Sequence, residues 1–310
     1  MEPVKQLQEA INWEALKLCL NVEERQLEAL FNEIETIVPL GNPLTLHPNI
    51  YSKVSGVAVE ELLRAHSQVK SAFFKLAPHD RVLKRGDPHY PPSLEFPRFL
   101  YARGNLELLK QRSVTLAGTG NVSNKGKENT VESVKALVKE GVAIVAGLNL
   151  GIEGIAHLTS LAEGGMSIGV LSTPLTETFP ESHKQLQDLI GQRGLLLTQF
   201  SPLVKLQRWH IILRNRVLAY LTEGTLLIEE RDGGSGVKQA FYALEANKRV
   251  VIFSQLLEQR TLVWPKRLIQ RQGVFTVKDA KTLYPLFFPE KKKQSHVKPL
   301  PQQFSLFELS

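Results

Sequence analysis

Cysteine is nearly absent from this chain of 310 residues, and long apolar runs are absent altogether. Cys19 is the only cysteine, so no intrachain disulfide can form, which favours a reducing compartment. The apolar runs are too short to cross a bilayer. The first residues lack the basic and apolar regions of a signal peptide. We therefore expect a cytoplasmic protein that does not associate with membranes.

The sequence also lacks a compact cluster of His, Cys and Asp at metal-ligand spacing, so we expect no metal and no other cofactor. Its net charge is +7. Residues 251–310 hold ten Lys and Arg against four Asp and Glu, so most of the excess lies near the C-terminus. Lys266, Arg267 and Arg271 fall in one predicted helix. A basic stripe of this kind favours polyanions such as nucleic acid, although a solvated helix face and tail would have the same composition.

Short apolar runs alternate with helix-length segments through the middle of the chain. The runs are residues 114–119, 142–147, 167–172, 194–198, 224–229 and 249–253. This alternation is typical of a doubly wound parallel α/β sheet with helices on both faces. Such sheets bind ligands in the loops at the carboxyl ends of their strands, so we expect the functional site at that edge.

Composition divides the chain into four parts. Residues 1–80 have apolar residues at helical spacing and predict a small helical N-terminal region. Residues 81–103 form a proline-rich connector that ends in a predicted edge strand at 99–103. Residues 104–288 make the α/β domain. Residues 289–310 are rich in Lys, Gln, Ser and Pro, a composition that predicts a disordered basic tail.

The first loop at the expected edge runs from Gly118 and Thr119 to Ser123, with Lys125 just after it. Small residues before a helix let backbone N–H groups approach an anion at the helix N-terminus. A tight turn between strand and helix would use the same residues. A dinucleotide fingerprint needs a third glycine where Ser123 stands, so NAD binding is disfavoured.

The second loop contains Gly147 and Gly151 and leads into Glu153 and His157. The last two are four residues apart on one predicted helix face, where they can hydrogen-bond or form an ion pair. We interpret His157 as a polar residue that positions the loop.

The third group combines Arg214, Asn215 and Arg216 with a glycine-rich loop. Two arginines at the start of an apolar helix are unexpected for packing alone, and the loop amides offer a place for an anion. Ser235 is expected to cap the next helix, with Lys238 in its first turn. The loop residues assigned to a phosphate site are Gly234, Ser235, Gly236 and Lys238. The alternative is an arginine–acid network with Glu229, Glu230 or Asp232.

The order of these motifs resembles that of the DprA/Smf family of DNA-processing proteins. Gly118-Thr-Gly-Asn-Val-Ser123 is similar to the family's Gly-Ser-Arg-x-x-Ser, and residues 146–157 are similar to its Ser-Gly-Leu-Ala-x-Gly-Ile-Asp-x-x-Ala-His. Arg214-Asn-Arg216 matches its Arg-Asn-Arg, Phe179-Pro180 stands for its Tyr-Pro, and Ser235-Gly236 is similar to part of its Ser-Gly-Ser. The match covers about residues 85–255.

The resemblance implies an extended Rossmann-like domain that binds single-stranded DNA, forms a homodimer and helps to load a RecA-type recombinase, as in natural transformation. We expect a DNA-processing or recombination accessory protein without catalysis. Two family residues differ here, because Gly120 replaces an Arg and Glu181 replaces a Lys that contact phosphate in the family. Each lost contact weakens an electrostatic affinity, which Lys125, Lys127 or Arg208 would have to restore.

Two other functions remain open. A regulatory or antitoxin protein of a defence system would keep the scaffold but act through a protein partner, such as a cognate toxin. A LOG-type nucleotide phosphoribohydrolase is suggested by residues 233–236, but Val237 and Ala240 stand where that pattern has Thr and Glu.

The last residues hold a separate motif. Gln303-Phe-Ser-Leu-Phe307 resembles the peptide that docks on the bacterial sliding clamp. In that interpretation Leu306 and Phe307 fill an apolar pocket while Gln303 hydrogen-bonds beside it. The alternative is a segment that folds back onto the body of the protein.

Overall fold

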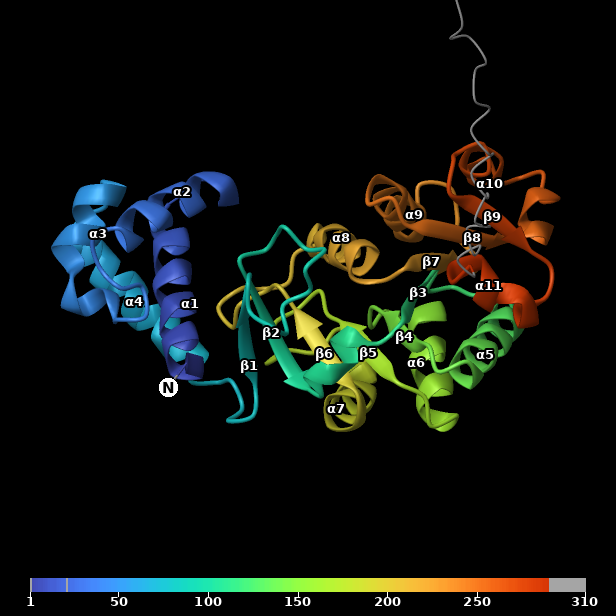
Figure 1. Ribbon diagram of the computed structural model, residues 1–310, viewed down its shortest axis with the longest axis horizontal. Coiled ribbons are helices and arrows are strands. Elements are labelled where there is room, and N and C mark those ends of the chain that lie inside the picture. Colours follow the sequence, from blue (N-terminus) through green and yellow to red (C-terminus); the bar gives the residue numbers. More distant parts are fainter. Residues whose placement is uncertain (1, 21, 290–310) are drawn as a thin grey trace, which may run out of the picture.

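The computed structural model describes residues 2–20 and 22–289, and their strands form one nine-stranded sheet (Figure 1). The strand order is β1-β2-β6-β5-β4-β3-β7-β8-β9. β2 is antiparallel to β1 and to β6, and the other neighbours are parallel. The strands are β1 (Arg81–Lys84), β2 (Phe99–Gly104), β3 (Ser113–Ala117), β4 (Ala143–Ala146), β5 (Ser167–Val170), β6 (Leu195–Thr198), β7 (Gly224–Leu227), β8 (Arg249–Phe253) and β9 (Val274–Val277).

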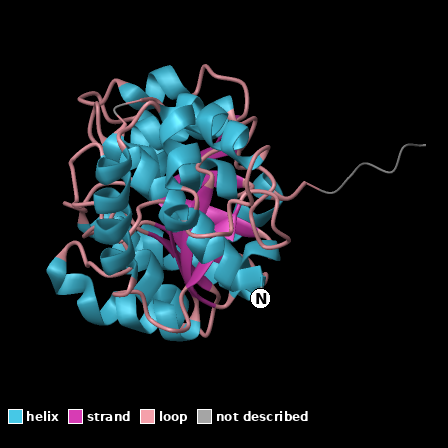
Figure 2. Ribbon diagram, turned by 90° about the vertical axis from the view of Figure 1, so that its left-hand side faces the viewer, coloured by secondary structure: helices cyan, strands magenta, loops and turns pink. Residues whose placement is uncertain are grey.

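Helices cover both faces of the sheet, which confirms the predicted doubly wound α/β architecture (Figure 2). One face is covered by α5 (Asn124–Lys139), α6 (Ile152–Ala162) and α7 (Lys184–Arg193), and the other by α8 (His210–Leu221) and α9 (Ser235–Glu245). Every residue of β3 to β7 is buried, because parallel strands between two helical layers have no solvent-facing side. The shorter helices are η2 (Leu106–Lys110), η3 (Glu181–His183), η4 (Ser254–Leu257), α10 (Trp264–Leu268), η5 (Ala280–Thr282) and α11 (Leu283–Phe287).

Four helices and a short 3-10 turn form the N-terminal region at the β1 end of the sheet: α1 (Glu2–Cys19), α2 (Glu24–Glu35), η1 (Leu44–Leu46), α3 (Pro48–Ser55) and α4 (Val59–Phe73). Trp13 and Phe31 meet edge to face with their ring centroids 5.2 Å apart. Trp13 also packs edge-on against Phe99 of β2, and Phe73 against Tyr101. The core of the N-terminal helices is therefore continuous with one end of the sheet.

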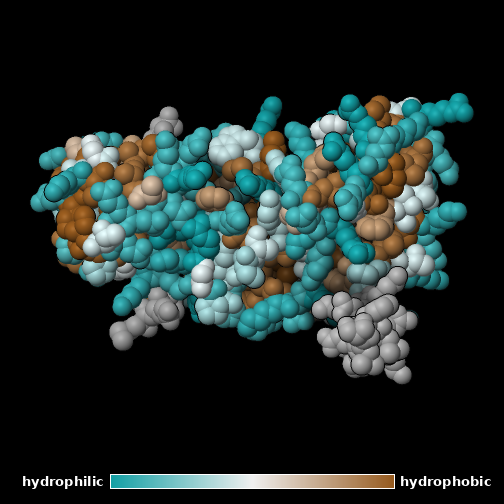
Figure 3. Space-filling model, turned by 45° about the horizontal axis from the view of Figure 1, so that its top comes forward, coloured by the Kyte–Doolittle hydropathy of each residue, from teal (hydrophilic) through white to brown (hydrophobic). Residues whose placement is uncertain are grey.

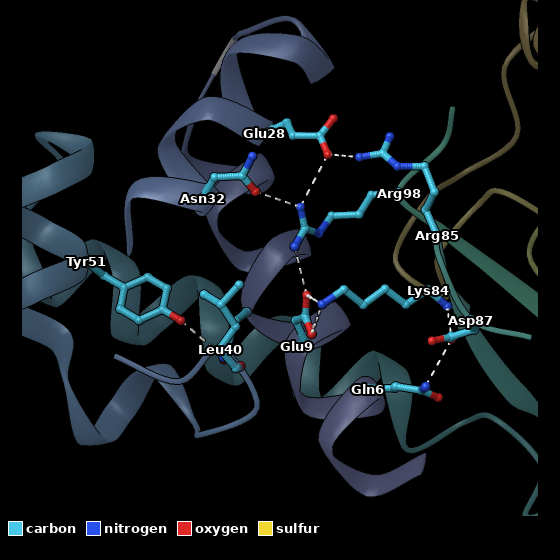
Figure 4. A network of polar contacts seen from close by, with 11 residues as sticks. Gln6, Glu9, Glu28, Asn32, Leu40, Tyr51, Lys84, Arg85, Asp87 and Arg98 are labelled. Atoms are coloured by element: carbon cyan, nitrogen blue, oxygen red, sulfur yellow. Dashed lines mark hydrogen bonds and ion pairs between the residues drawn. The ribbon is translucent and has the colours of Figure 1, made fainter. Parts of the chain in front are cut away.

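A buried arginine joins this region to the sheet (Figure 4). Arg98, which precedes β2, is 5% exposed and contacts Glu9 of α1 at 3.0 Å and Glu28 of α2 at 3.3 Å. Both carboxylates have a second partner, because Lys84 lies 2.8 Å from Glu9, and Arg85 pairs with Glu28. The junction is thus a shared ionic network with two acids and three cations.

The sheet differs from the sequence prediction at both ends. Residues 99–103 do form a strand, but β1 pairs outside it, so the predicted edge strand is not at the edge. Neither β1 nor β9 was predicted, because both are short and only partly buried and therefore lack a continuous apolar run. The predicted basic helix ends at Leu268 and leaves Arg271 in the following turn.

The surface of the molecule is mostly hydrophilic on the face shown in Figure 3, with hydrophobic areas between the polar side chains. Within the described residues, none of the helices combines the length and the apolar character needed to cross a membrane. The clamp-like motif at residues 303–307 lies outside the described residues.

Candidate nucleic-acid interface

The predicted loops converge on one cleft at the carboxyl edge of the sheet, as expected. The cleft has a volume of about 870 Å³. It lies between the loops that follow β3, β4 and β7 and the start of α8. Its lining includes Gly118, Thr119, Gly120, Asn121, Asn149, Leu150, Phe179, Pro180, Arg208, Ile211, Ile212, Glu229, Glu230, Arg231, Gly233, Gly234, Ser235, Lys238, Gln259 and Leu262.

The first two loops touch through their backbones. Gly151 has φ 76°, a conformation that L side chains rarely adopt. A Cβ atom there would lie 2.5 Å from the carbonyl oxygens of Thr119 and Gly120. Gly151 is therefore required by this close approach, in addition to any contact with a ligand. Gly120 differs, because a Cβ atom there would meet its nearest neighbour, the Leu150 carbonyl oxygen, at an ordinary 3.5 Å.

A buried arginine–glutamate pair lies beneath the cleft. Arg214 is 1% exposed, and its two terminal nitrogens donate to the Glu153 carboxylate at 3.0 and 2.9 Å. Glu153 also accepts a hydrogen bond from the Asn149 N–H at 2.8 Å. The alternative of an arginine–acid network is thus observed, but the acid is Glu153 instead of Glu229, Glu230 or Asp232.

Gly147 leaves room for this pair. A Cβ atom on Gly147 would lie 1.4 Å from Nη1 of Arg214 and 2.5 Å from the Glu153 carboxylate. Asn215 accepts from Arg214 at 2.9 Å and donates to the Ser235 carbonyl at 2.9 Å, so it ties the pair to the start of α9. These contacts position the loops from below and leave Arg214 no exposed donor for a ligand.

Two carboxylates occupy the helix N-termini at which the sequence predicted an anion. Glu229 accepts hydrogen bonds from the hydroxyl and the N–H of Ser123, at 2.6 and 3.3 Å, at the start of α5. Glu230 accepts from the Gly236 N–H at 3.0 Å, at the start of α9. The prediction that Ser235 caps α9 is wrong. Gly234 is the N-cap residue, and no side-chain cap bond forms. A phosphate at either helix N-terminus would meet a fixed negative charge.

His157 lies beneath the second loop and is completely buried. It does not pair with Glu153, as the spacing had suggested, because its ring turns toward β4 and β5. Nε2 donates to the Gly147 carbonyl at 2.8 Å, so Nδ1 accepts from the Ser167 hydroxyl at 2.7 Å. Burial lowers the pKa of His157 to about 4. The ring is therefore neutral at pH 7 and acts as a positioning residue.

Three exposed cations, Arg208, Arg231 and Lys238, line the cleft, and we call them the rim cations. None of them forms an ion pair with another residue in the described ranges 2–20 and 22–289. Phe179 and Leu150 line the same cleft and are 43% and 51% exposed. Arg231 was not among the predicted site residues. Its place four residues beyond the end of β7, in a loop at the carboxyl edge of the sheet, was the available signal.

Two exposed cations among the predicted site residues lie outside the cleft. Arg216 is exposed further along α8, over the Tyr220 ring, in a separate pocket of about 270 Å³ that Glu23 and Glu95 also line. Lys125 is exposed at the start of α5 and pairs with its neighbour Glu128. The structure therefore separates both cations from the cleft that the other loop residues form.

The structure also bears on a metal site and on the LOG-type pattern. Among residues 2–20 and 22–289, no group of three or more His, Cys, Asp or Glu residues is placed to hold a metal ion. Val237 and Ala240, which stand where the LOG-type pattern has Thr and Glu, are buried in α9 against the sheet.

The chain matches the family model described as DNA recombination-mediator protein A over residues 81–286. It is 31% identical to DNA processing protein DprA of Bacillus subtilis over 189 residues, which cover 61% of this chain and 63% of the relative. This alignment spans less than two thirds of that relative. The DprA protein of Streptococcus pneumoniae is 29% identical over 243 residues, which cover 77% of this chain and 80% of the relative.

Two solved structures have the same fold. DprA from Streptococcus pneumoniae has a TM-score of 0.70 and 25% identity, with 87% of this chain and 95% of that chain covered. DprA from Helicobacter pylori, described for its single-stranded DNA binding mode, has a TM-score of 0.58 and 21% identity. The alignment covers 66% of this chain and 93% of the Helicobacter pylori chain. Because the family model spans more than half of the chain, including the whole cleft, this chain belongs to the DNA recombination-mediator protein A family, also called DprA/Smf.

Proposed function

We propose that this chain is a non-catalytic accessory protein of DNA recombination that binds single-stranded DNA in the cleft. The observation that carries the proposal is the position of the rim cations beside the exposed Phe179 and Leu150 side chains. Unpaired cations attract backbone phosphates, and an exposed aromatic ring supports a base by stacking. Family membership and the DNA-binding description of the Helicobacter pylori relative support the same ligand.

The proposed binding mode differs from an anion held at a helix N-terminus. Glu229 and Glu230 already accept hydrogen bonds from the amides there, so phosphates are expected at the rim. The bases would then face the apolar side chains that line the cleft, which include Leu150, Ile211 and Phe179. A strand bound in this way makes few sequence-specific contacts, because stacking and phosphate contacts do not distinguish between bases.

The test is a fluorescence-anisotropy titration of labelled oligo(dT) against salt concentration. Arg231→Gln with Lys238→Gln should weaken binding and reduce the salt slope by about 1.4, since each single-strand phosphate contact contributes about 0.7. Lys139→Gln with Arg193→Gln is the matched control. These two exposed cations lie in the last turns of α5 and α7, and their loss removes the same charge. Equal affinities of the wild type and the rim variant would contradict the proposal.

The two family cations that this chain lacks provide a gain-of-function test. Gly120→Arg has room at its Cβ atom, and Glu181→Lys lies next to Pro180 of the cleft. Together they should raise the affinity for oligo(dT) about tenfold at about 0.1 M salt by adding two phosphate contacts and removing one acid. An unchanged affinity would mean that the strand does not pass these positions.

One observation favours a second candidate, a DprA-like regulatory protein that acts through a protein partner such as a toxin. The carboxylates of Glu229 and Glu230 make the floor of the cleft acidic, which opposes a polyanion. Absence of oligo(dT) binding even at about 20 mM salt would favour this candidate. The RecA-type recombinase, the homodimer and the sliding clamp stay predictions. Hydrolysis of nucleoside monophosphates or DNA by the purified protein would contradict the non-catalytic assignment.

A further inference from the structure

A second basic groove lies between α9 and α10, outside the cleft. It has a volume of about 570 Å³ and is lined by Phe241 of α9 and by Arg267, Gln270 and Arg271. Both arginines are exposed, and neither forms an ion pair with another described residue. Two unpaired cations that line one groove attract negative charge, so this groove favours an anionic occupant.

The groove adjoins the cleft in two places. Lys238 of the cleft and Phe241 of the groove are three residues apart in α9, which is about 4.5 Å along the helix axis and on neighbouring sides of it. Leu262 lines the cleft just before α10 begins, and Asp232 accepts from the Trp264 N–H at 2.8 Å. The loop that borders the cleft therefore also holds the start of α10 in place. Both helices lie at the same end of the sheet (Figure 1).

We propose that a single strand bound in the cleft continues past Lys238 into this groove, where Arg267 and Arg271 contact two further phosphates. This extension rests on the proposed function and assigns the strand a direction across the protein. Arginine suits the task because its planar guanidinium group can donate two hydrogen bonds to one phosphate. The half-buried ring of Phe241 lines the same groove and provides a surface on which a base can stack.

The groove should therefore matter only for strands that are long enough to reach it. An oligonucleotide of about four to six nucleotides fills only the cleft, whereas a strand of about twenty or more nucleotides covers the neighbouring groove as well. A change confined to Arg267 and Arg271 should leave the affinity for the short strand intact. The same change should weaken the binding of the long strand.

The experiment titrates the full chain with labelled oligo(dT) of six and of twenty-four nucleotides. Arg267→Gln with Arg271→Gln is compared with the rim variant Arg231→Gln with Lys238→Gln, and with the charge-matched control Lys139→Gln with Arg193→Gln. We expect the groove variant to lose about tenfold in affinity for the long strand at about 0.1 M salt, with its salt slope reduced by about 1.4. The rim variant should lose affinity for both strands, and the control for neither.

The possible outcomes separate the two proposals. If the rim variant loses affinity while the groove variant binds the long strand as the wild type does, the extension is wrong and the cleft assignment stands. If the groove variant instead converts a dimer to a monomer in sedimentation velocity without changing DNA affinity, the groove is an interface between two copies. If the wild type binds neither oligonucleotide, both proposals are overturned.

Discussion

Two buried arginines hold two regions of the molecule in different ways. Arg98 joins the N-terminal helices to the sheet, and it shares Glu9 and Glu28 with two other cations. Arg214 lies beneath the cleft, and Glu153 is its only ion-pair partner within the described residues. The Arg98 network keeps a partner for each acid when one cation is removed, whereas the Arg214 pair does not.

The two regions also differ in what else holds them together. The junction also has an aromatic core, and the Arg98 guanidinium lies 5.0 Å from the Phe31 ring centroid and 5.5 Å from that of Trp13. Packing and charge together hold the helices there. Among the described residues, no aromatic pair of this kind involves the loops that follow β3, β4 and β7. Their positions depend on Arg214, Glu153 and the hydrogen bonds around them.

The largest effect should come from breaking the exclusive pair. Arg214→Ala leaves the carboxylate of Glu153 buried without a cation, which should lower the free energy of unfolding by about 3–5 kcal/mol. Chemical denaturation monitored by circular dichroism measures this change in the free energy of unfolding. Gly147→Ala should have a similar effect, since its Cβ atom would displace the guanidinium group. If Arg214→Met combined with Glu153→Leu is no more stable than Arg214→Ala, the uncompensated charge is not the cause.

Acid should weaken the packing around His157, beneath the second loop of the cleft, before it weakens the junction. The pKa of His157 is lowered by burial to about 4, below the ordinary value of 6.5 in the unfolded chain. Between these values the unfolded state binds more protons, so stability falls as the pH is lowered from about 6.5 to about 4. The loss is at most about 3 kcal/mol.

The measurement is the free energy of unfolding as a function of pH for the wild type and for His157→Gln, in which this slope should be smaller. Burial also lowers the pKa of His66 in α4. His66→Gln therefore measures how much the N-terminal region contributes to the pH dependence of stability. An equal flattening of the slope in both variants would mean that the cleft is not the more acid-sensitive region.

Breaking the shared network should have the smallest effect of the three. Arg98→Ala leaves Lys84 beside Glu9 and Arg85 beside Glu28, so the free energy of unfolding should fall by about 2 kcal/mol. Affinity for oligo(dT) should not change, because the junction lies away from the cleft. Combining Arg98→Ala with Lys84→Ala should cost more than the sum of the single changes, since Glu9 then loses both partners. A strictly additive result would show that the network has no such redundancy.

The sequence predicted the fold better than it predicted the roles of the site residues. The central strands were recognisable because burial on both faces requires a continuous apolar run, and β1 and β9 were not because they are partly exposed. Gly147 and Arg214 were both assigned to a phosphate. In the structure the glycine makes room for the arginine, whose partner is Glu153. Residue type and spacing could not reveal a partner that far along the chain.

The amino-acid sequence by itself determined the α/β class, the edge of the sheet at which the glycine-rich loops gather, and the family resemblance, because these depend on local periodicity and short motifs. Only the tertiary structure decided which charges are available to a ligand. Glu229 and Glu230 accept hydrogen bonds at two helix N-termini, and Arg214 is paired with Glu153. Arg231 and Lys238 remain exposed at the rim. The physical reason is that a charge is free or neutralised according to the neighbours that folding brings to it, and those neighbours come from distant strands.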